Sequence, residues 1–446
     1  MIHMPFIKDV ARLSILAVVL STVGTVFAQN WDPTPRTDPD ADSDKSLRPI
    51  VFVHGQNGAG EQFERQAKHF NSNGYPVSWI NTFDYNTARR DEDNSPDLDA
   101  FIDEVLARTG AKQVDLAGHS RGTGVAQKYL RSDPKRAAKV AHYANVAGRP
   151  SDNAGGVPTL VIGSLGDLLV GPSEASGDAL HVLIPDMDHV AVMTCRETFA
   201  VMHTFFNDGK APTTLDWVRQ QEILVGGYAQ YYITNFAAIG AKVEVWEVEQ
   251  ATGFREGGEP LVSFSANDQG EWGPFRAEPA QHYEFVVTHD SFEGPKHFYR
   301  EPFTRTNMLM YFRLSSTDEK GRPSPLDVAP EFKSDVTTIL SIRHEDGSVF
   351  PRKHSLRVNG TEIASEATTP EKNTCVGIYI VDTNQNGKSD NVMATEKPWA
   401  GIFISTIDMH LRAGKKESIA VEFQGRTINV PALASSKEGL LYVVFD

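Results

Sequence analysis

The sequence predicts an α/β domain with a mostly parallel sheet and helices on both faces, followed by one or two all-β sandwich modules. From Pro49 to Asn207, short apolar runs alternate with amphipathic segments of helical spacing, which is typical of parallel strands connected by helices. Beyond Ile239, alternating strands separated by glycine and proline turns replace this pattern, as in all-β modules. The length of 446 residues also favours two or three domains.

The N-terminal residues 1–28 have the layout of a signal peptide. Lys8 and Arg12 precede the apolar run LSILAVVLSTVGTVF, and the small residue Ala28 follows it. The alternative is a membrane anchor, but the run is too short to favour spanning. We therefore expect cleavage, a secreted or periplasmic protein, and no stable membrane anchor afterwards. Residues 29–46 are rich in Pro, Asp and Ser and indicate a solvated linker.

The α/β domain is expected to occupy residues 47–212. Its predicted elements follow in order: strand 49–55, helix 61–74, strand 76–83, helix 96–109, strand 113–120, helix 123–132, strands 139–148, 157–164 and 179–185, and helix 196–207. The strands are continuous apolar runs, as expected for a sheet covered on both faces. The helix predicted at 61–74 ends with a glycine.

Two β modules are expected over residues 213–322 and 323–446. Residues 213–235 look partly helical. Strands are predicted at 241–249, 260–268, 282–290 and 308–316 in the first module, and at 337–345, 354–363, 375–384, 401–411, 417–425 and 440–446 in the second. The pattern of the first module resembles a transthyretin-like or carboxypeptidase-regulatory-like sandwich. It could extend a substrate groove or bind a surface, or it could only stabilise the chain.

Composition limits the partners. The formal net charge of −15 argues against nucleic acid or an anionic membrane surface, because both favour a basic footprint. The two cysteines, Cys195 and Cys375, could pair in an exported protein, although two separate buried thiols are favoured. Neither lies in a cluster that suggests a metal ligand or a nucleophile. The oligomeric state is left open.

The stretch Gly118-His119-Ser120-Arg121-Gly122 lies between a predicted strand and a predicted helix. This is the context of a nucleophile elbow, in which two glycines permit a sharp turn that exposes the serine hydroxyl at the edge of the sheet. The alternative is a serine that merely caps the following helix. Because the strand, turn and helix come in the required order, we favour Ser120 as a nucleophile.

A serine nucleophile needs two donors for the oxyanion. One should be the amide after the nucleophile, at Arg121, and the other usually follows an early strand. His54-Gly55-Gln56 stands after the first predicted strand, so we expect the Gln56 amide to be the second donor. A phosphate-binding loop is the rival reading of VHGQNGAG, but no lysine follows its glycines.

An orienting acid and a base should follow Ser120 along the chain. Asp167 comes directly after the strand predicted at 157–164, whereas its rival Asp152 lies in the loop before that strand. His189 lies in a loop after the next strand, and is the expected base. Its rivals are His181 within a strand and His203 within a helix, and both are expected to be structural.

Four residues near the predicted triad are expected to be structural rather than catalytic. Asp186 and Asp188 are too close in sequence to His189 to orient it easily, and are interpreted as loop residues. His54 and His119 flank the site and are expected to pack or hydrogen-bond there. His119 is also part of the elbow sequence.

The order Ser120, Asp167, His189 is that of α/β-hydrolases, and residues 49–207 resemble the lipases and esterases of that fold. The His54-Gly55 motif and the GHSRG elbow are similar to those of small bacterial triacylglycerol lipases. The chain beyond about residue 211 resembles the C-terminal β-domains of an archaeal long-chain lipase. The resemblance implies an α/β-hydrolase fold, a Ser-His-Asp mechanism without a required cofactor, and a β-domain near the acyl-binding side.

A calcium site is a further hypothesis. Asp382, Asn384, Asn386 and Asp390, with Gly387 among them, have the spacing of an oxygen-rich calcium loop. Met393 stands where such loops carry a bidentate glutamate, and a strand precedes the stretch. The alternative is a β-hairpin loop built from turn-forming asparagine and glycine.

Taken together, the sequence predicts a secreted serine carboxylic-ester hydrolase, a lipase before other ester hydrolases, with a lipid or ester as its partner. A short-chain carboxylesterase, a polyester hydrolase, or a non-catalytic binding protein with a hydrolase-like domain are the alternatives, because a fold does not fix a substrate. The apolar residues that flank the acid and base could line an acyl pocket or belong to the core: Leu168, Leu169, Val170, Val190, Val192 and Met193.

Overall fold

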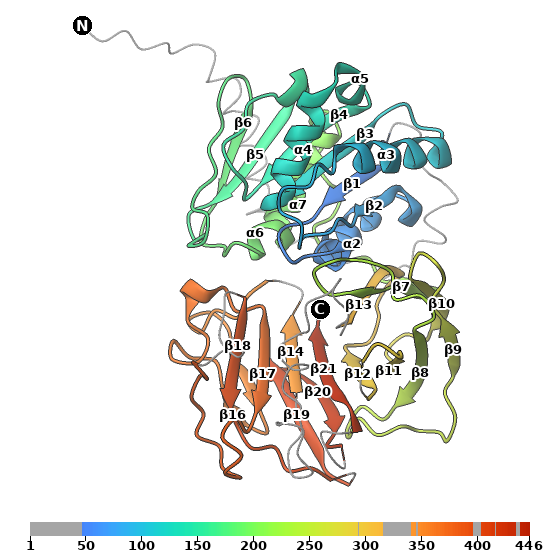
Figure 1. Ribbon diagram of the computed structural model, residues 1–446, viewed down its shortest axis with the longest axis vertical. Coiled ribbons are helices and arrows are strands. Elements are labelled where there is room, and N and C mark those ends of the chain that lie inside the picture. The colour runs from blue at the N-terminus through green and yellow to red at the C-terminus, as the bar shows by residue number, and fades with distance from the viewer. Residues whose placement is uncertain are drawn as a thin grey trace, which may run out of the picture.

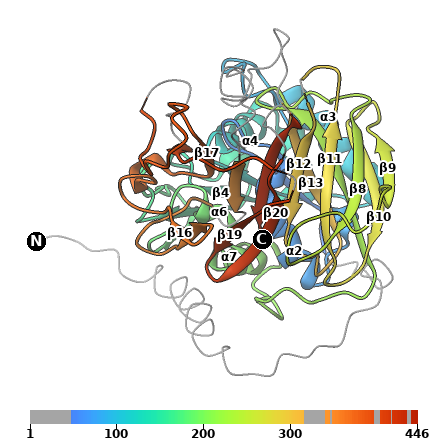
Figure 2. The same cartoon turned by 90° about the horizontal axis from the view of Figure 1, so that it is seen from below.

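The computed structural model describes residues 47–292, 294–314, 340–344, 347–395, 403–414, 416–433 and 438–446. The expected signal peptide (1–28) and linker (29–46) lie outside the described residues. Figure 1 shows an α/β module at one end of the molecule and two β-sandwiches at the other, and both Figures 1 and 2 show the sandwiches side by side.

The α/β module contains a six-stranded parallel sheet in the order β2-β1-β3-β4-β5-β6. The strands are β1 (Ile50–Val53), β2 (Ile80–Phe83), β3 (Val114–His119), β4 (Val140–Val146), β5 (Thr159–Ser164) and β6 (Leu180–Ile184). The helices are α2 (Glu64–Ser72), α3 (Ser95–Thr109), α4 (Arg121–Ser132), α5 (Pro134–Ala137), α6 (Ala191–Thr194) and α7 (Arg196–Phe206). Short 3-10 helices lie at Gly60–Phe63, Val77–Trp79 and Ala154–Gly156. The α/β fold predicted from the sequence is confirmed.

Helices cover both faces of this sheet because its strands are apolar on both sides. In β1, Ile50 and Phe52 pack with α2 and α7, whereas Val51 and Val53 pack with α3 and α4. Successive strand residues point to opposite faces, so one short apolar run supplies two cores. The carboxyl ends of β1, β3 and β5 then lie at one edge of the sheet, where loops with functional residues are expected.

The two β-sandwiches share one eight-stranded sheet, in the order β18-β17-β14-β21-β12-β11-β8-β9. Its strands are β8 (Lys242–Val248), β9 (Val262–Ser265), β11 (His282–Thr288), β12 (Lys296–Arg300), β14 (Leu340–His344), β17 (Gly377–Val381), β18 (Ile404–Asp408) and β21 (Leu440–Phe445). The parallel pair of β12 and β21 joins the two halves. The chain therefore builds a continuous sheet from segments far apart in sequence.

Smaller sheets cover the two halves of the shared sheet. Strands β7 (Ile223–Tyr231), β10 (Glu271–Ala277) and β13 (Asn307–Leu314) complete what we call the first sandwich. Strands β15 (Leu356–Val358), β16 (Thr361–Glu362), β19 (Ser418–Phe423) and β20 (Arg426–Pro431) complete the second, which also has a 3-10 helix at Glu371–Asn373.

The expectation of partly helical structure over residues 213–235 is wrong. The segment contains strand β7 and no helix. Gly226 and Gly227 disfavour a helix, and a side chain at Gly227 would lie 2.1 Å from the Met310 carbonyl oxygen of β13. The glycine therefore permits a close approach of two strands.

Buried charges connect the α/β module to both sandwiches. Arg300 of β12 pairs with Glu64 of α2 at 2.6 Å and with Asp446 at 2.7 Å. Lys68 of α2 pairs with the same two carboxylates at 3.0 and 2.9 Å. Since a buried charge without a partner is costly, separating these modules would destabilise each of them. Figure 1 shows the C-terminal end close to α2.

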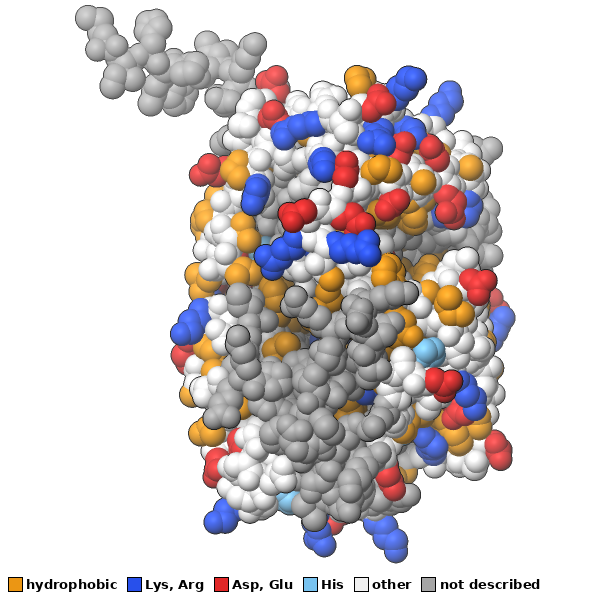
Figure 3. All heavy atoms as spheres, viewed as in Figure 1, with side chains coloured by type: hydrophobic (Ala, Val, Ile, Leu, Met, Phe, Trp, Pro, Cys, Tyr) orange, Lys and Arg blue, Asp and Glu red, His pale blue; other side chains and the backbone are white. Residues whose placement is uncertain are grey.

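The surface of the α/β module carries charges of both signs, and both cysteines are buried. Acidic and basic side chains are interspersed over the face of the α/β module in Figure 3. No helix among the described residues is both long and apolar enough to cross a membrane. Cys195 and Cys375 are buried, unpaired thiols, and burial raises the pKa of each to about 12.

Candidate active site

Ser120 lies at a sharp turn between β3 and α4. Its φ of 51° and ψ of −123° are rare for a residue with a side chain. A side chain at Gly118 would come within 2.9 Å of the Gly122 carbonyl, and one at Gly122 within 2.2 Å of the Val53 carbonyl. Both glycines are therefore needed for the turn, and the local geometry is that of a nucleophile elbow.

The structure brings Ser120, His189 and Asp167 together. His189 Nε2 lies 2.8 Å from Ser120 Oγ, and His189 Nδ1 lies 2.7 Å from Asp167 Oδ2. The other oxygen of Asp167 accepts hydrogen bonds from the backbone amides of Leu169 and Val170 at 2.9 and 3.0 Å. The three side chains come from the ends of β3, β5 and β6, and they have the geometry of a nucleophile, base and orienting acid.

The environment favours an ionised Asp167. Burial raises the pKa of this carboxyl, but the hydrogen bond and charge of His189 and the amides of Val170 and Leu169 outweigh burial, so the pKa lies below its ordinary value. An ionised carboxylate can fix the ring orientation of His189 and stabilise its protonated form.

The rival residues lie elsewhere. Asp152 pairs with Arg131 at 2.5 Å on the surface. His181 contacts the Ser173 carbonyl at 2.7 Å, and His203 is buried beside Phe70. Asp186 pairs with Arg352 at 2.5 Å and Asp188 accepts from the Ser348 amide at 3.3 Å, so both loop residues contact the second sandwich. None of these side chains contacts Ser120.

Gln56 and Arg121 both lie near Ser120, and their role as oxyanion donors stays a prediction. Arg121 is the first residue of α4, where a backbone N–H has no intrahelical acceptor. The backbone before Gln56 is close to the nucleophile, because a side chain at Gly55 would lie 3.1 Å from Ser120 Cβ. The Arg121 guanidinium donates to Gln56 Oε1 at 2.7 Å, so the two candidate donors are also connected through their side chains.

A second connection passes through His119. Gln62 accepts a hydrogen bond from the Gly55 amide at 3.3 Å and contacts His119 Nδ1 at 2.6 Å. His119 Nε2 lies 2.8 Å from the His189 carbonyl oxygen, and burial holds the pKa of His119 down to about 3. The neutral His119 ring can thus donate from Nε2 to the His189 carbonyl oxygen and accept at Nδ1 from the Gln62 amide group. Gln62 was not predicted, since nothing in its local sequence distinguishes it.

Of the six apolar residues that flank Asp167 and His189, two are buried, two are exposed, and Leu169 and Val190 are half-buried. Val192 and Met193 are fully buried in the core of the α/β module. Leu168 is 63% exposed and Val170 is 49% exposed, close to an equally exposed Leu165 at 64%. Exposed leucines beside Asp167 provide an apolar surface next to the candidate site.

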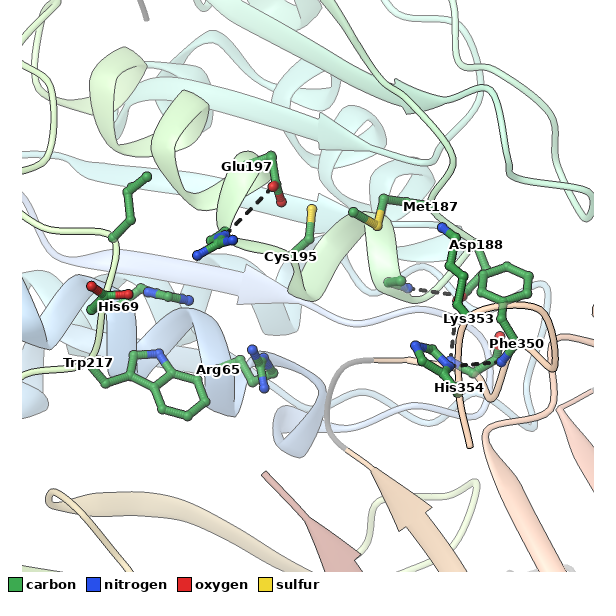
Figure 4. Close-up of a pocket in the computed structure, with 15 residues that line it drawn as sticks. Arg65, His69, Met187, Asp188, Cys195, Glu197, Trp217, Phe350, Lys353 and His354 are labelled. Carbon is green, nitrogen blue, oxygen red and sulfur yellow. Dashed lines mark hydrogen bonds and ion pairs between the residues drawn. The ribbon is translucent and has the colours of Figure 1, made fainter. Parts of the chain in front are cut away.

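A pocket of about 510 Å³ lies between the α/β module and the second sandwich. Figure 4 shows Arg65 and Trp217 on one side and Phe350, Lys353 and His354 on the other. Arg65 lies over the Trp217 ring at 4.6 Å. Asp188, next to the base in sequence, also lines the pocket, but Ser120, Asp167 and His189 do not. The pocket is therefore separate from the reacting atoms.

In the predicted calcium loop, the oxygen-bearing side chains are hydrogen-bonded within the loop. Asp382 accepts hydrogen bonds from the amides of Asn386 and Gly387 at 3.0 and 2.8 Å, and His410 lies 3.2 Å from it. Asn384 and Asn386 direct their amide groups toward Asp390 at 3.2 and 3.4 Å. These contacts are those of a loop with Asn and Gly turns, but the expected β-hairpin alternative is wrong, because the flanking strands β17 and β18 pair in parallel. The described residues contain no group of three His, Cys, Asp or Glu side chains that could hold a metal. Calcium binding stays a prediction.

The parallel sheet, its elbow and the Ser-His-Asp arrangement define an α/β-hydrolase. A family model described as Lipase (class 2) matches residues 47–139, which include Gln56 and Ser120. A model described as Lipase C-terminal domain matches residues 221–317, and a further C-terminal domain model matches residues 344–446. Each model matches less than half of the chain, and together they support a lipase/esterase family of α/β-hydrolases with C-terminal domains.

Several solved hydrolases are similar to this chain. A lipase of Bacillus licheniformis is 16% identical over 37% of this chain and 94% of its own, with a TM-score of 0.33. A predicted hydrolase of Thermoplasma acidophilum is 15% identical over 37% and 89%, with a TM-score of 0.28. A pyrethroid hydrolase of Sphingobium faniae is 15% identical over 36% and 98%, with a TM-score of 0.29. Such values do not indicate a substrate.

Proposed function

We propose that this chain is an exported serine carboxylic-ester hydrolase that cleaves acyl esters of lipids. The observation that carries the proposal is the position of His189, within hydrogen-bond distance of Ser120 Oγ at 2.8 Å and of Asp167 at 2.7 Å. A serine hydroxyl becomes a useful nucleophile at neutral pH only beside such a base.

The proposed reaction has two stages. His189 accepts the Ser120 proton as Oγ attacks the ester carbonyl, and the amides of Gln56 and Arg121 stabilise the oxyanion. His189 then gives the proton to the departing alcohol, which leaves an acyl-enzyme. Water, deprotonated by His189, attacks the acyl carbon and releases the carboxylic acid while Ser120 regains its proton.

The exposed leucines favour a lipid ester over a small soluble one. Leu165 and Leu168 are both more than half exposed next to the acid loop, and burying such side chains against an apolar surface is favourable. A lipid aggregate would provide that surface. Short-chain carboxylesters and polyesters remain alternative substrates of the same chemistry.

The test is a series of p-nitrophenyl esters from acetate to palmitate, with the wild-type chain and Ser120→Ala. We expect Ser120→Ala to lower kcat by several orders of magnitude, and the wild-type chain to prefer long acyl chains. Retained activity in Ser120→Ala would contradict the serine mechanism. A preference for acetate or butyrate would favour the short-chain esterase.

A second experiment tests the lipid surface. Leu165→Ser with Leu168→Ser should weaken hydrolysis of emulsified triacylglycerol but leave hydrolysis of soluble p-nitrophenyl butyrate nearly unchanged. Leu261→Ser is the matched control, because Leu261 is 50% exposed in the first sandwich. Equal emulsion activity in all three proteins would rule out the leucine surface.

A further inference from the structure

The loop that carries Gln56 is in contact with the first sandwich. Between β7 and β8 the chain makes a turn over residues 231–236, and this turn lies against the loops that follow β1 and β2. In Figure 1, β7 and β13 lie directly against the α/β module. Asn235, in the turn, and Thr87, after β2, make the contacts between the turn and these loops.

Asn235 makes a complete set of hydrogen bonds. Its Nδ2 has three acceptors within reach of its two hydrogens: the carbonyl oxygens of Gly58 and Tyr85, each at 3.0 Å, and His54 Nε2 at 3.1 Å. Its Oδ1 accepts from Arg313 at 2.8 Å. Because two partners of Nδ2 are carbonyls and the partner of Oδ1 is a guanidinium, the orientation of the amide is fixed.

These contacts also fix the tautomer of His54. The backbone amide of Tyr85 donates to His54 Nε2 at 3.2 Å, so Nε2 is an acceptor, and Asn235 Nδ2 lies 3.1 Å from the same nitrogen. The fully buried ring is neutral, since burial above all holds its pKa down to about 3. The proton must therefore be on Nδ1, which donates to the Gly55 carbonyl oxygen at 2.9 Å. The ring is also stacked on Tyr85 at 4.4 Å.

The Gly55 carbonyl belongs to the same planar peptide unit as the Gln56 N–H. Holding that carbonyl therefore sets the direction of the N–H group proposed to bind the oxyanion. The Gly58 amide donates to the same carbonyl at 3.2 Å. The Gly55–Gln56 peptide is thus held by His54, and His54 is held by Asn235 of the first sandwich.

Thr87, which follows β2, provides a second connection between the turn and the loop that carries Gln56. Its hydroxyl donates to the Ile233 carbonyl at 2.9 Å and accepts from the Asn57 amide at 3.2 Å. Its own carbonyl accepts from the side chains of Gln56 at 3.0 Å and Arg121 at 2.8 Å. Thr87 is fully buried. The same turn therefore reaches both residues that are proposed to supply the oxyanion donors.

We propose that Asn235 is a positioning residue for ester hydrolysis, and that the first sandwich aligns the Gln56 amide of the oxyanion hole through Asn235 and His54. This inference rests on the proposed function. It assigns the first sandwich a direct role in the rate of the chemical step, besides any contribution to stability or substrate binding.

The test compares Asn235→Gly with Asn359→Gly in the full chain. Both asparagines have positive φ values, 57° and 47°, which glycine tolerates. Asn359 lies in the turn between β15 and β16 and accepts from the Ala420 amide. We expect Asn235→Gly to lower kcat for p-nitrophenyl butyrate by about 10–100-fold, with KM within about twofold. Asn359→Gly should keep the wild-type kcat.

Two further readouts separate positioning from loss of fold. Titration with a fluorophosphonate gives the fraction of active protein and corrects kcat for any unfolded chain. The pH profile of kcat/KM should keep its wild-type midpoint, because Asn235 does not contact His189. A loss of kcat that disappears after this correction would overturn the proposal.

Thr87 provides variants for the case in which Asn235→Gly does not fold. Thr87→Val keeps the shape of the side chain but loses the hydroxyl, and should lower kcat, whereas Thr87→Ser keeps the hydroxyl and should restore it. Equal kcat in the folded valine and serine variants would contradict the role of the turn.

Hydrogen exchange tests the positioning without turnover. Amide exchange in a peptide spanning residues 50–58 should be about tenfold faster in Asn235→Gly than in Asn359→Gly. Unchanged exchange would overturn the inference even if no substrate had been found. Conversely, failure of the proposed function would show as equal activity in the wild-type chain and Ser120→Ala, whatever the exchange rates are.

Discussion

Asp186, three residues before His189 in sequence, forms a two-point ion pair with Arg352 of the second sandwich. The carboxylate oxygens lie 3.0 and 2.5 Å from the two guanidinium nitrogens, and Lys353 adds a contact at 2.9 Å. The next acid, Asp188, accepts from the Ser348 amide at 3.3 Å. The loop that carries His189 is therefore in contact with the second sandwich, as the loop that carries Gln56 is with the first.

This ion pair is exposed, so its removal should have a small effect on stability. Hydrogen bonds from Arg352 and Lys353 hold the pKa of Asp186 below its ordinary value. The stabilisation is therefore present at neutral pH and is lost as the pH falls through the pKa of the folded state. We expect Asp186→Asn to lower the free energy of unfolding by at most about 1 kcal/mol at low salt and by less at high salt.

Thermal unfolding at low and at high salt measures this effect. Asp178→Asn, at another exposed aspartate of the α/β module, is the control. A stability loss that does not change with salt would show that Asp186 acts through packing rather than through charge.

The two glycines after Ser120 should respond in opposite ways to alanine. A side chain at Gly122 would come within 2.2 Å of the Val53 carbonyl and 2.5 Å of the His54 carbonyl, and these backbone atoms lead into the oxyanion loop. Gly122→Ala should therefore cost about 1–3 kcal/mol of stability and lower kcat as well. At Gly124, within α4, nothing lies within 4 Å of an added side chain, so Gly124→Ala should gain up to about 1 kcal/mol.

Melting temperatures and kcat of both variants provide the comparison. If Gly122→Ala were as stable and as active as Gly124→Ala, the turn at Ser120 would not require the close approach to β1.

Asp167→Asn should leave the site folded and reduce its rate strongly. The asparagine can still accept from the amides of Leu169 and Val170, but it carries no charge to stabilise protonated His189. In the serine protease example of this triad the same change lowers kcat by about 10⁴, and we expect a loss of about 10³–10⁴ here. Steady-state kinetics with p-nitrophenyl butyrate measures it, with Asp152→Asn as the control. A comparable loss in Asp152→Asn would contradict the assignment of the acid.

The sequence predicted those parts of the site that depend on local order. Ser120, Asp167 and His189 each follow a recognisable apolar strand, and parallel strands bring their ends to one edge. Asn235 could not be predicted in this way, because its partners His54 and Tyr85 are far from it in sequence and its own segment gave a wrong expectation of helix. The shared eight-stranded sheet was not predicted either, since the pairing of β12 with β21 leaves no local pattern.

Asp84 should make stability depend on pH at the boundary between the α/β module and the first sandwich. Its carboxylate accepts from Tyr311 at 2.9 Å and from Gln230 at 3.0 Å. Burial dominates over these bonds and raises the pKa of Asp84 from 3.8 to about 6. The folded chain therefore binds this proton more tightly than the unfolded chain does, and the Asp84 contribution to stability falls as the pH rises from about 4 to about 6.

Asp84→Asn removes this ionisation while keeping an oxygen acceptor for Tyr311. The variant should gain stability relative to the wild-type chain as the pH rises through the same window, by at most about 3 kcal/mol. Denaturant unfolding at about pH 4, 5, 6 and 7 measures the difference in stability between the variant and the wild-type chain. The control is Asp290→Asn, at an exposed aspartate of the first sandwich. A difference that stayed constant with pH would show that Asp84 ionises in the folded chain as an ordinary carboxyl. The buried boundary would then tolerate its charge through the Tyr311 and Gln230 hydrogen bonds alone.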